Sequence, residues 1–169
     1  FKYKNLAMAV QAVSLCGFKE ELILKKINQI KDVNGRLELI KQYPNNIKVF
    51  IDYAHTPDAL LKTLAALKND YGNNISIVFG CGGDRDKKKR PLMAKIANKF
   101  CKKIYITDDN PRKENPKKIR SEIVSNLKGS NYHNIANRSQ AIKKAILNSE
   151  YNEIILVAGK GHETNQDYG

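Results

Sequence analysis

The sequence predicts an α/β domain built on a mostly parallel β-sheet, and two observations lead to this prediction. From about residue 36 onward, short apolar runs alternate with longer segments of helical spacing, which is the pattern of parallel strands joined by helices. One run, residues 75–80 ("ISIVFG"), is continuously apolar, as expected for a buried parallel strand. The 169 residues suffice for one domain with a hydrophobic core, or for one domain and part of another.

Residues 1–31 depart from this pattern and predict two helices instead. Apolar side chains recur at helical spacing over residues 5–13 and 20–30, and Gly17 lies between them as a helix terminator. Two helices alone cannot bury both of their faces, so we expect them to be the end of a preceding domain. Residues 32–38 ("DVNGRLE") would then form the hinge.

The elements after the hinge follow from apolar spacing together with capping residues. Strands are predicted over residues 36–40, 47–53, 75–80, 103–108 and 152–159. Helices are predicted over residues 56–72, 90–101, 115–129 and 138–149. Thr56 and Asn115 are expected to cap helices that begin at Pro57 and Pro116, and Pro91 is expected to begin a third helix.

The charge of the chain does not indicate a nucleic-acid-binding protein. The formal net charge is +13, but most of the basic residues are lysines spread along the chain without interleaved aromatic residues. A solvated lysine-rich surface accounts for most of them, and an anionic ligand such as a nucleotide accounts for local clusters. We therefore expect no nucleic-acid partner.

Cysteine and histidine usage argues against a zinc site. The three cysteines, Cys16, Cys81 and Cys101, are far apart without a Cys-x-x-Cys pair, and the three histidines are scattered. This usage is typical of reduced thiols in the cytoplasm. Because no apolar run approaches about 18 residues, we expect neither a membrane span nor a membrane partner.

Chemically rich segments follow four of the predicted strands. They are residues 52–58, 80–90, 108–112 and 159–163. If the strands are parallel, these segments open at one edge of the sheet, where ligands bind in such folds. One of them lies within "ITDDNPRKENP", residues 106–116, which is either a crowded turn or one wall of a pocket.

Each of these segments has two interpretations when taken alone. In residues 79–91 ("FGCGGDRDKKKRP"), Arg85 offers a fork for carboxylate or phosphate, although a flexible basic loop explains the same residues. Asp52 and His55 fit acid–base chemistry or the positioning of a nucleotide. The Glu163 carboxylate can accept hydrogen bonds from an ammonium group. The chain contains neither Gly-x-Gly-x-x-Gly nor Gly-x-x-x-x-Gly-Lys-[Ser/Thr], so it has no phosphate loop of its own.

Taken together and in order, these segments resemble one family closely. The motifs "VNGRLE", "DYAHTPDAL", "VFGCGGDRDKKKRPLM", "TDDNPR" and "LVAGKGHE" are similar to the C-terminal region of the Mur ligases. The match is to the members that add meso-diaminopimelate. The resemblance implies that residues 1–34 end a central ATP-binding domain. It also implies that residues 35–169 form a Rossmann-like C-terminal domain, with helices on both faces of its sheet and its last helix missing.

The resemblance also implies an activity for the whole protein. Such enzymes form an amide bond with ATP in peptidoglycan precursor synthesis, joining meso-diaminopimelate to UDP-N-acetylmuramoyl-L-alanyl-D-glutamate through an acyl phosphate. ATP and Mg²⁺ are implied, with the phosphate loop and magnesium ligands outside this chain. We therefore expect no catalytic residue and no metal ligand here, and no activity from the chain alone. The resemblance further implies that the partners are small molecules only, that the protein is a monomer, and that it lies in the bacterial cytoplasm.

The resemblance assigns the "DNPR" segment to a diaminopimelate pocket. It implies that Arg85, Asn110 and Arg112 contact the carboxylate of the amino acid, and that Asp109 orients Arg112 or the turn. Diaminopimelate carries an extra carboxylate that lysine lacks. An unpaired buried guanidinium is costly, so Arg112 is expected to select diaminopimelate over lysine.

The remaining implied contacts involve the ammonium group and the nucleotide. Gly159, through its carbonyl, and Glu163 are expected to bind the distal ammonium. Four residues are expected near ATP or at the domain junction: Asn5, Arg36, Asp52 and His55. Two alternatives stay open, namely a lysine-adding or other Mur or folylpolyglutamate ligase, and, with less support, a basic nucleic-acid-binding module.

Overall fold

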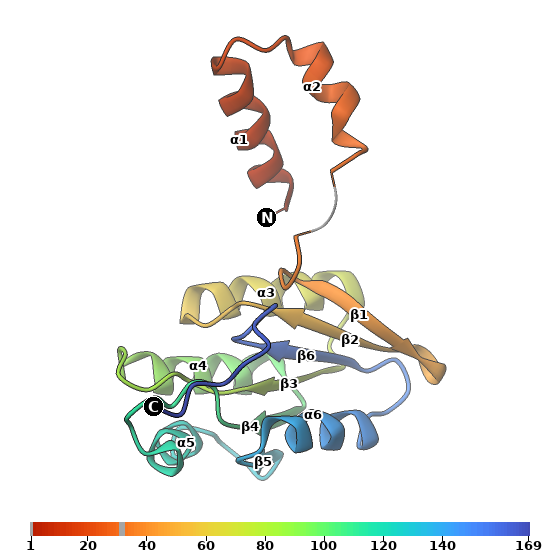
Figure 1. Cartoon of the computed structure of the whole chain (residues 1–169). Coiled ribbons are helices and arrows are strands. Elements are labelled where there is room, and N and C mark those ends of the chain that lie inside the picture. Colours follow the sequence, from red (N-terminus) through yellow and green to blue (C-terminus); the bar gives the residue numbers. More distant parts are fainter. Residues whose placement is uncertain (1, 31–32) are drawn as a thin grey trace. The chain divides into compact units, whose positions relative to one another are not determined.

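The computed structural model describes residues 2–30 and 33–169, which fall into two compact units, Phe1–Val33 and Asn34–Gly169 (Figure 1). The hinge expected over residues 32–38 begins at Asp32, which lies outside the described residues. Each unit is described by itself.

The first unit consists of the two predicted helices, α1 (Lys2–Leu15) and α2 (Glu20–Ile27). Gly17 lies between them at a φ of +91°, a left-handed conformation that glycine adopts without strain. The second helix ends at Ile27, earlier than the predicted residue 30. No side chain of α2 is buried, and Leu15 of α1 is 84% exposed.

The second unit is built on a six-stranded sheet in the order β1-β2-β6-β3-β4-β5. The strands are β1 (Glu38–Tyr43), β2 (Ile47–Asp52), β3 (Ile75–Phe79), β4 (Lys103–Ile106), β5 (Tyr132–Asn134) and β6 (Ile154–Ala158). Only the β1–β2 pair is antiparallel, and a short 3₁₀ turn, Pro44–Asn46, joins these two strands. All other neighbours are parallel, which confirms the predicted mostly parallel sheet.

Helices cover both faces of this sheet, as predicted (Figure 1). They are α3 (Pro57–Tyr71), α4 (Lys89–Phe100), α5 (Pro116–Val124) and α6 (Arg138–Leu147). The first three pack on one face through a large apolar core that includes Leu64, Met93 and Ile123. The last packs on the other face, where Ala141 and Ala145 meet Val78 and Tyr105.

The predicted helix caps are present. The Thr56 side chain accepts a hydrogen bond from the Ala59 amide, and the Asn115 side chain accepts from the Lys117 and Lys118 amides. Each bond satisfies donors that a helix N-terminus otherwise leaves free. Local sequence therefore determines where α3 and α5 begin.

Strand β1 covers Glu38–Tyr43 instead of the predicted residues 36–40, and other details also differ from the prediction. Helix α4 begins at Lys89, so Pro91 lies inside its first turn, where a missing amide donor costs nothing. Helix α5 ends at Val124, before the predicted residue 129. Strand β5 has no predicted counterpart, because three residues at a sheet edge carry too little apolar pattern to detect. Among the described residues, no helix combines the length and apolarity that a bilayer crossing requires.

Candidate functional site

The four chemically rich loops converge at one edge of the sheet. Strands β2, β6, β3 and β4 are parallel neighbours, so the segments that follow them leave from the same side. Backbone hydrogen bonds join the loops directly. The Gly159 amide donates to the Asp52 carbonyl at 3.0 Å, and the Gly83 amide donates to the Asn110 carbonyl at 2.9 Å.

Glycines permit the close contact between the β3–α4 and β4–α5 loops. A Cβ at Gly83 would collide with the carbonyl oxygen of Pro111, and one at Gly80 would collide with that of Thr107. A Cβ at Gly82 would lie 2.9 Å from the Arg112 guanidinium and 4.0 Å from Cγ of Arg85. The glycines therefore allow the backbones to touch and let two arginines flank Gly82.

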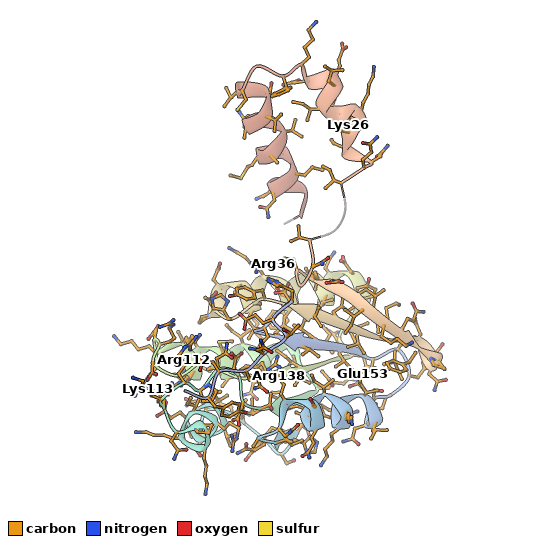
Figure 2. The ribbon with its side chains drawn as sticks, viewed as in Figure 1. Lys26, Arg36, Arg112, Lys113, Arg138 and Glu153 are labelled. Atoms are coloured by element: carbon orange, nitrogen blue, oxygen red, sulfur yellow. The ribbon has the colours of Figure 1, made fainter. Side chains whose placement is uncertain are left out.

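Arg112 joins these two loops. Its backbone has a φ of +52°, and its Nη1 donates to the carbonyls of Gly83 at 2.9 Å and Asn110 at 3.3 Å. Its Nε lies 3.7 Å from a carboxylate oxygen of Asp167. The carbonyls of Gly83 and Asn110 hold this guanidinium, so of the two roles expected for Asp109, orienting the turn fits better than orienting Arg112. Figure 2 shows Arg112 beside Lys113, near the C-terminal end of the chain.

Arg85 is exposed, and its guanidinium donates to the Asp84 carbonyl at 3.2 Å. In the described part of the chain it has no carboxylate within ion-pair distance. Its fork therefore remains open to an anionic ligand.

Asn110 and Glu163 are brought together by a lysine that the sequence did not single out. Lys160 is only 6% exposed, and its ammonium donates to Asn110 Oδ1 at 2.9 Å and to Glu163 Oε2 at 2.8 Å. The Asn110 amide also donates to Glu163 at 3.2 Å. The hydrogen bond from Lys160 is the main cause that holds the pKa of Glu163 below its usual range. Lys160 could not be predicted from the sequence as a site residue, because lysines are rarely buried.

A second buried cation, Arg138, lies at the start of α6. Its Nη2 donates to the Ala158 carbonyl at 2.8 Å, directly before Gly159, whereas its Nη1 is buried without a partner among the described residues. Burial lowers the pKa of Arg138, and the charges of Asp109 and Glu163 act in the opposite direction. Asp109 is itself buried, with a carboxylate oxygen close to Gly159. Figure 2 labels this arginine.

The C-terminal segment packs on the β4–α5 loop. This contact was not predicted. Gln166 donates to the carbonyls of Asp108 and Asp109 at 3.0 and 2.8 Å. The Asp167 amide donates to Asn110 Oδ1 at 2.9 Å, and its carbonyl accepts from the Arg112 amide at 3.0 Å. These bonds fix the loop that carries three of the expected pocket residues.

Asp52 connects separate backbone segments through hydrogen bonds. Its carboxylate accepts hydrogen bonds from the Leu37 amide at 2.6 Å and from the Ala54 amide at 2.7 Å, and its carbonyl accepts from the amides of Gly159 and Gly161. Gly35 lies against the same loop, since a Cβ on Gly161 would come 2.8 Å from the Gly35 carbonyl. These bonds hold the start of the second unit against the Gly159–Glu163 loop.

Arg36 and His55 meet at one aromatic ring. The Arg36 guanidinium lies 4.4 Å from the centroid of Tyr53, and the His55 ring packs edge-on at 4.9 Å. Both side chains are exposed (Arg36 is labelled in Figure 2). Asn5 is exposed on α1 in the first unit.

Arg90, which was not predicted as a site residue, forms ion pairs that connect the elements next to the same edge. It is fully buried, and it pairs with Glu114 at 2.8 Å and with Glu122 at 2.6 Å. The hydrogen bond from Arg90 is the largest influence lowering the pKa of Glu114 to about 2. This network joins α4, the β4–α5 loop and α5. Within residues 2–30 and 33–169, no three metal-ligating side chains gather into a metal site.

Comparison with known proteins shows the family to which the chain belongs. A family model described as "Mur ligase, glutamate ligase domain" matches residues 35–161, most of the chain. The chain belongs to the Mur ligase family. The resemblance noted from the motifs is thereby confirmed, as is the Rossmann-like fold that it implied.

Individual Mur ligases are similar over the whole chain. It is 48% identical, over 171 residues, to the UDP-N-acetylmuramoyl-L-alanyl-D-glutamate--2,6-diaminopimelate ligase of Rickettsia conorii, covering 100% of this chain and 35% of that protein. The equivalent protein of Haemophilus influenzae is 44% identical over 170 residues, with 100% and 35% covered. The chain thus spans about a third of the length of the curated relatives it matches.

Solved structures of Mur ligases share the fold. A UDP-N-acetylmuramoyl-L-alanyl-D-glutamate--2,6-diaminopimelate ligase matches with a TM-score of 0.73 and 36% identity, over 99% of this chain and 34% of that chain. The UDP-N-acetylmuramate-alanine ligase of Thermotoga maritima matches with a TM-score of 0.68 over 92% of this chain and 33% of that chain. At 21% identity, this second likeness concerns the fold alone.

Proposed function

We propose that this chain is the amino-acid-binding part of a Mur ligase that adds meso-diaminopimelate to UDP-N-acetylmuramoyl-L-alanyl-D-glutamate. One observation carries the proposal: Arg112, Asn110 and Glu163 lie together at the carboxyl edge of a parallel sheet in a chain 48% identical to such ligases. Residues 1–34 would end the central ATP-binding domain, and residues 35–169 would form the C-terminal domain.

The proposed pocket presents both signs of charge to an amino-acid head group. Arg85 and Arg112 supply guanidinium forks for the carboxylate, and Asn110 supplies an amide donor. Glu163, the Gly159 carbonyl and the buried Asp109 supply acceptors for the ammonium. A ligand with only one of the two groups would leave part of this set unpaired, which lowers its affinity.

The chemical step would use groups outside this chain. Mur ligases use ATP and Mg²⁺ to convert a carboxylate of the nucleotide substrate into an acyl phosphate, which an amine then attacks. This chain would hold the amine of diaminopimelate in place for that attack, and holding two reactants in register lowers the barrier strongly. Arg36, His55 and Asn5 would lie toward ATP or the central domain. The hydrogen bonds that Asp52 accepts from backbone amides favour a role at the domain junction over contact with the nucleotide.

Amino-acid selectivity of the full-length protein tests the proposal. We expect amide formation with meso-diaminopimelate and little with lysine, because lysine lacks the second, distal carboxylate that Arg112 would bind. Preference for lysine would support the alternative of a lysine-adding ligase, and preference for glutamate on a folate acceptor would support a folylpolyglutamate ligase. The 169-residue chain alone should form no amide, because it lacks a phosphate loop.

A further inference from the structure

Lys160 occupies an unusual position for a lysine. Its side chain is 7% exposed, and its ammonium lies between two residues of the proposed pocket, 2.8 Å from Glu163 and 2.9 Å from Asn110. Burying an ammonium group is expensive unless it is paired and hydrogen-bonded. Both requirements are met here, but only by groups that the proposed function assigns to ligand binding.

The contacts of Lys160 determine which atoms Asn110 can offer to a ligand. Oδ1 of Asn110 accepts from the Lys160 ammonium and from the Asp167 amide, both at 2.9 Å. A carbonyl oxygen has two lone pairs, so this acceptor is saturated. Nδ2 has one hydrogen directed at Glu163 at 3.2 Å and one hydrogen left over. Asn110 can therefore donate to a ligand and cannot accept from it.

The same lysine leaves Glu163 as an acceptor. Oε2 of Glu163 takes hydrogen bonds from Lys160 and Asn110, which leaves Oε1 for other donors. The side chain is 34% exposed, so solvent and ligand can reach it. The charged groups that face it are Lys160 and Arg138 from α6, the Tyr53 hydroxyl after β2 is a titratable hydrogen-bond donor, and Lys160 has the largest effect on the pKa of Glu163.

We propose that Lys160 is a positioning residue that gives the pocket its polarity, fixing Asn110 as a donor for the ligand carboxylate and Glu163 as an acceptor for the ligand ammonium. This inference rests on the proposed function. It assigns Lys160 a role in specificity, because only an amino-acid head group satisfies both fixed partners at once.

The test uses the full-length ligase and two substitutions of the same lysine. Lys160→Met removes both the charge and the donor, so it should raise KM for diaminopimelate about 10-fold or more, with KM for ATP nearly unchanged. Lys160→Gln keeps a donor for Asn110 but removes the charge, so its KM should be intermediate. Lys113→Met, at an exposed lysine of the adjacent loop, should leave both values unchanged.

The pH profile separates positioning from a merely structural role. Without the Lys160 charge, the pKa of Glu163 should rise, because Lys160 is the main cause that lowers it. The acid limb of kcat/KM for diaminopimelate should therefore move to higher pH in both Lys160 variants but not in Lys113→Met. If Lys160→Met fails to fold, as a thermal melt would reveal, Lys160→Gln carries the test.

Two results would overturn the inference. An unchanged KM and pH profile in a folded Lys160→Gln protein would show that Lys160 has no role in binding. A lower KM would show that its ammonium competes with the ligand instead of ordering the pocket. Failure of the unsubstituted full-length enzyme to use diaminopimelate would contradict the proposed function itself, and is thus distinguishable from either result.

Discussion

At the scale of a single side chain, Arg112 contacts both backbone carbonyls and a carboxylate. Part of its guanidinium holds the backbone of the β3–α4 and β4–α5 loops together, and its Nε faces Asp167 at 3.7 Å. A distance of 3.7 Å is too long for a hydrogen bond, and the Asp167 side chain is exposed, so this pair contributes little energy. A ligand carboxylate can displace Asp167 at small cost, while the carbonyl contacts keep the arginine in place.

Replacing Arg112 by alanine in the full-length enzyme should weaken diaminopimelate binding selectively. We expect KM for diaminopimelate to rise about 10- to 100-fold, because a hydrogen bond to a charged group is lost. KM for ATP should change less than about 2-fold, since no ATP contact is assigned to Arg112. Steady-state kinetics with each substrate varied in turn measures both values.

Asp167→Asn is the matched control for that experiment. It weakens the side-chain partner of Arg112 but leaves the backbone bonds of residue 167 intact, so both KM values should stay close to those of the unsubstituted enzyme. A rise in KM for ATP with no change for diaminopimelate in Arg112→Ala would contradict the assignment of Arg112.

Single residues also show how much of the proposed site could be predicted. Arg85, Asn110, Arg112 and Glu163 were predicted from motifs, because polar groups after successive strands indicate a ligand edge, and the structure brings Asn110, Arg112 and Glu163 into contact. Lys160, Arg138 and Arg90 were missed, because their importance comes from burial, and nothing in a one-dimensional sequence distinguishes a buried cation from the many solvated ones. The motif predicted roles for Gly159 and Glu163, but it predicted none for Lys160, which lies between them.

At the scale of elements, caps and apolar runs predicted most boundaries. Helix α3 was placed correctly at both ends, since Thr56, Pro57 and Gly72 each have a local reason to be there. Strand β5 was missed because its pairing with β4 depends on tertiary contact and not on its own pattern. The start of α4 was misplaced, because Pro91 is acceptable anywhere in the first turn.

The network that joins α4 to α5 should make stability depend on pH. Glu114 has a pKa of about 2 in the fold against 4.5 for the ordinary group, so its pairing stabilises the fold fully above about pH 4.5. This contribution is lost as the pH falls from about 4.5 toward 2. Glu114→Gln should therefore lower the free energy of unfolding by about 1–3 kcal/mol at neutral pH.

Urea unfolding at several pH values measures this effect. The difference between Glu114→Gln and the unsubstituted chain should shrink as the pH approaches 2, since the Glu114 carboxylate becomes increasingly protonated in both the unfolded and the folded state. Glu122→Gln is the control, and it should cost less, because that side chain is 35% exposed compared with 11% for Glu114. Equal losses at all pH values would show that the ion pair is not the cause.

At the scale of the whole molecule, the two units differ in how much they bury. The second unit has two apolar cores on either side of its sheet. The first unit has short helices whose apolar side chains stay largely exposed, such as Met8 at 69% and Leu22 at 56%. Helices of this length are marginal in water without a packed face.

Amide hydrogen exchange should therefore divide the chain into two classes. We expect amides of α1 and α2 in the 169-residue chain to exchange with less than about 10-fold protection, and those of β3 and β6 to be strongly protected. In the full-length protein, where a larger domain can cover the apolar faces, the helix amides should become protected. Strong protection of α1 and α2 in the short chain would contradict this expectation.

The attachment of Gly35 to the Gly159–Glu163 loop has a mechanical consequence. The Asp52 carboxylate accepts from the Leu37 amide while its carbonyl accepts from Gly159 and Gly161, so one residue connects the point where the chain enters the second unit with the loop beside the proposed pocket. A change in the conformation of the entering segment can therefore reach that loop through Asp52. By thermodynamic linkage, if that conformation changes the affinity for a ligand at the loop, ligand binding must shift the conformational equilibrium of the segment by the same factor.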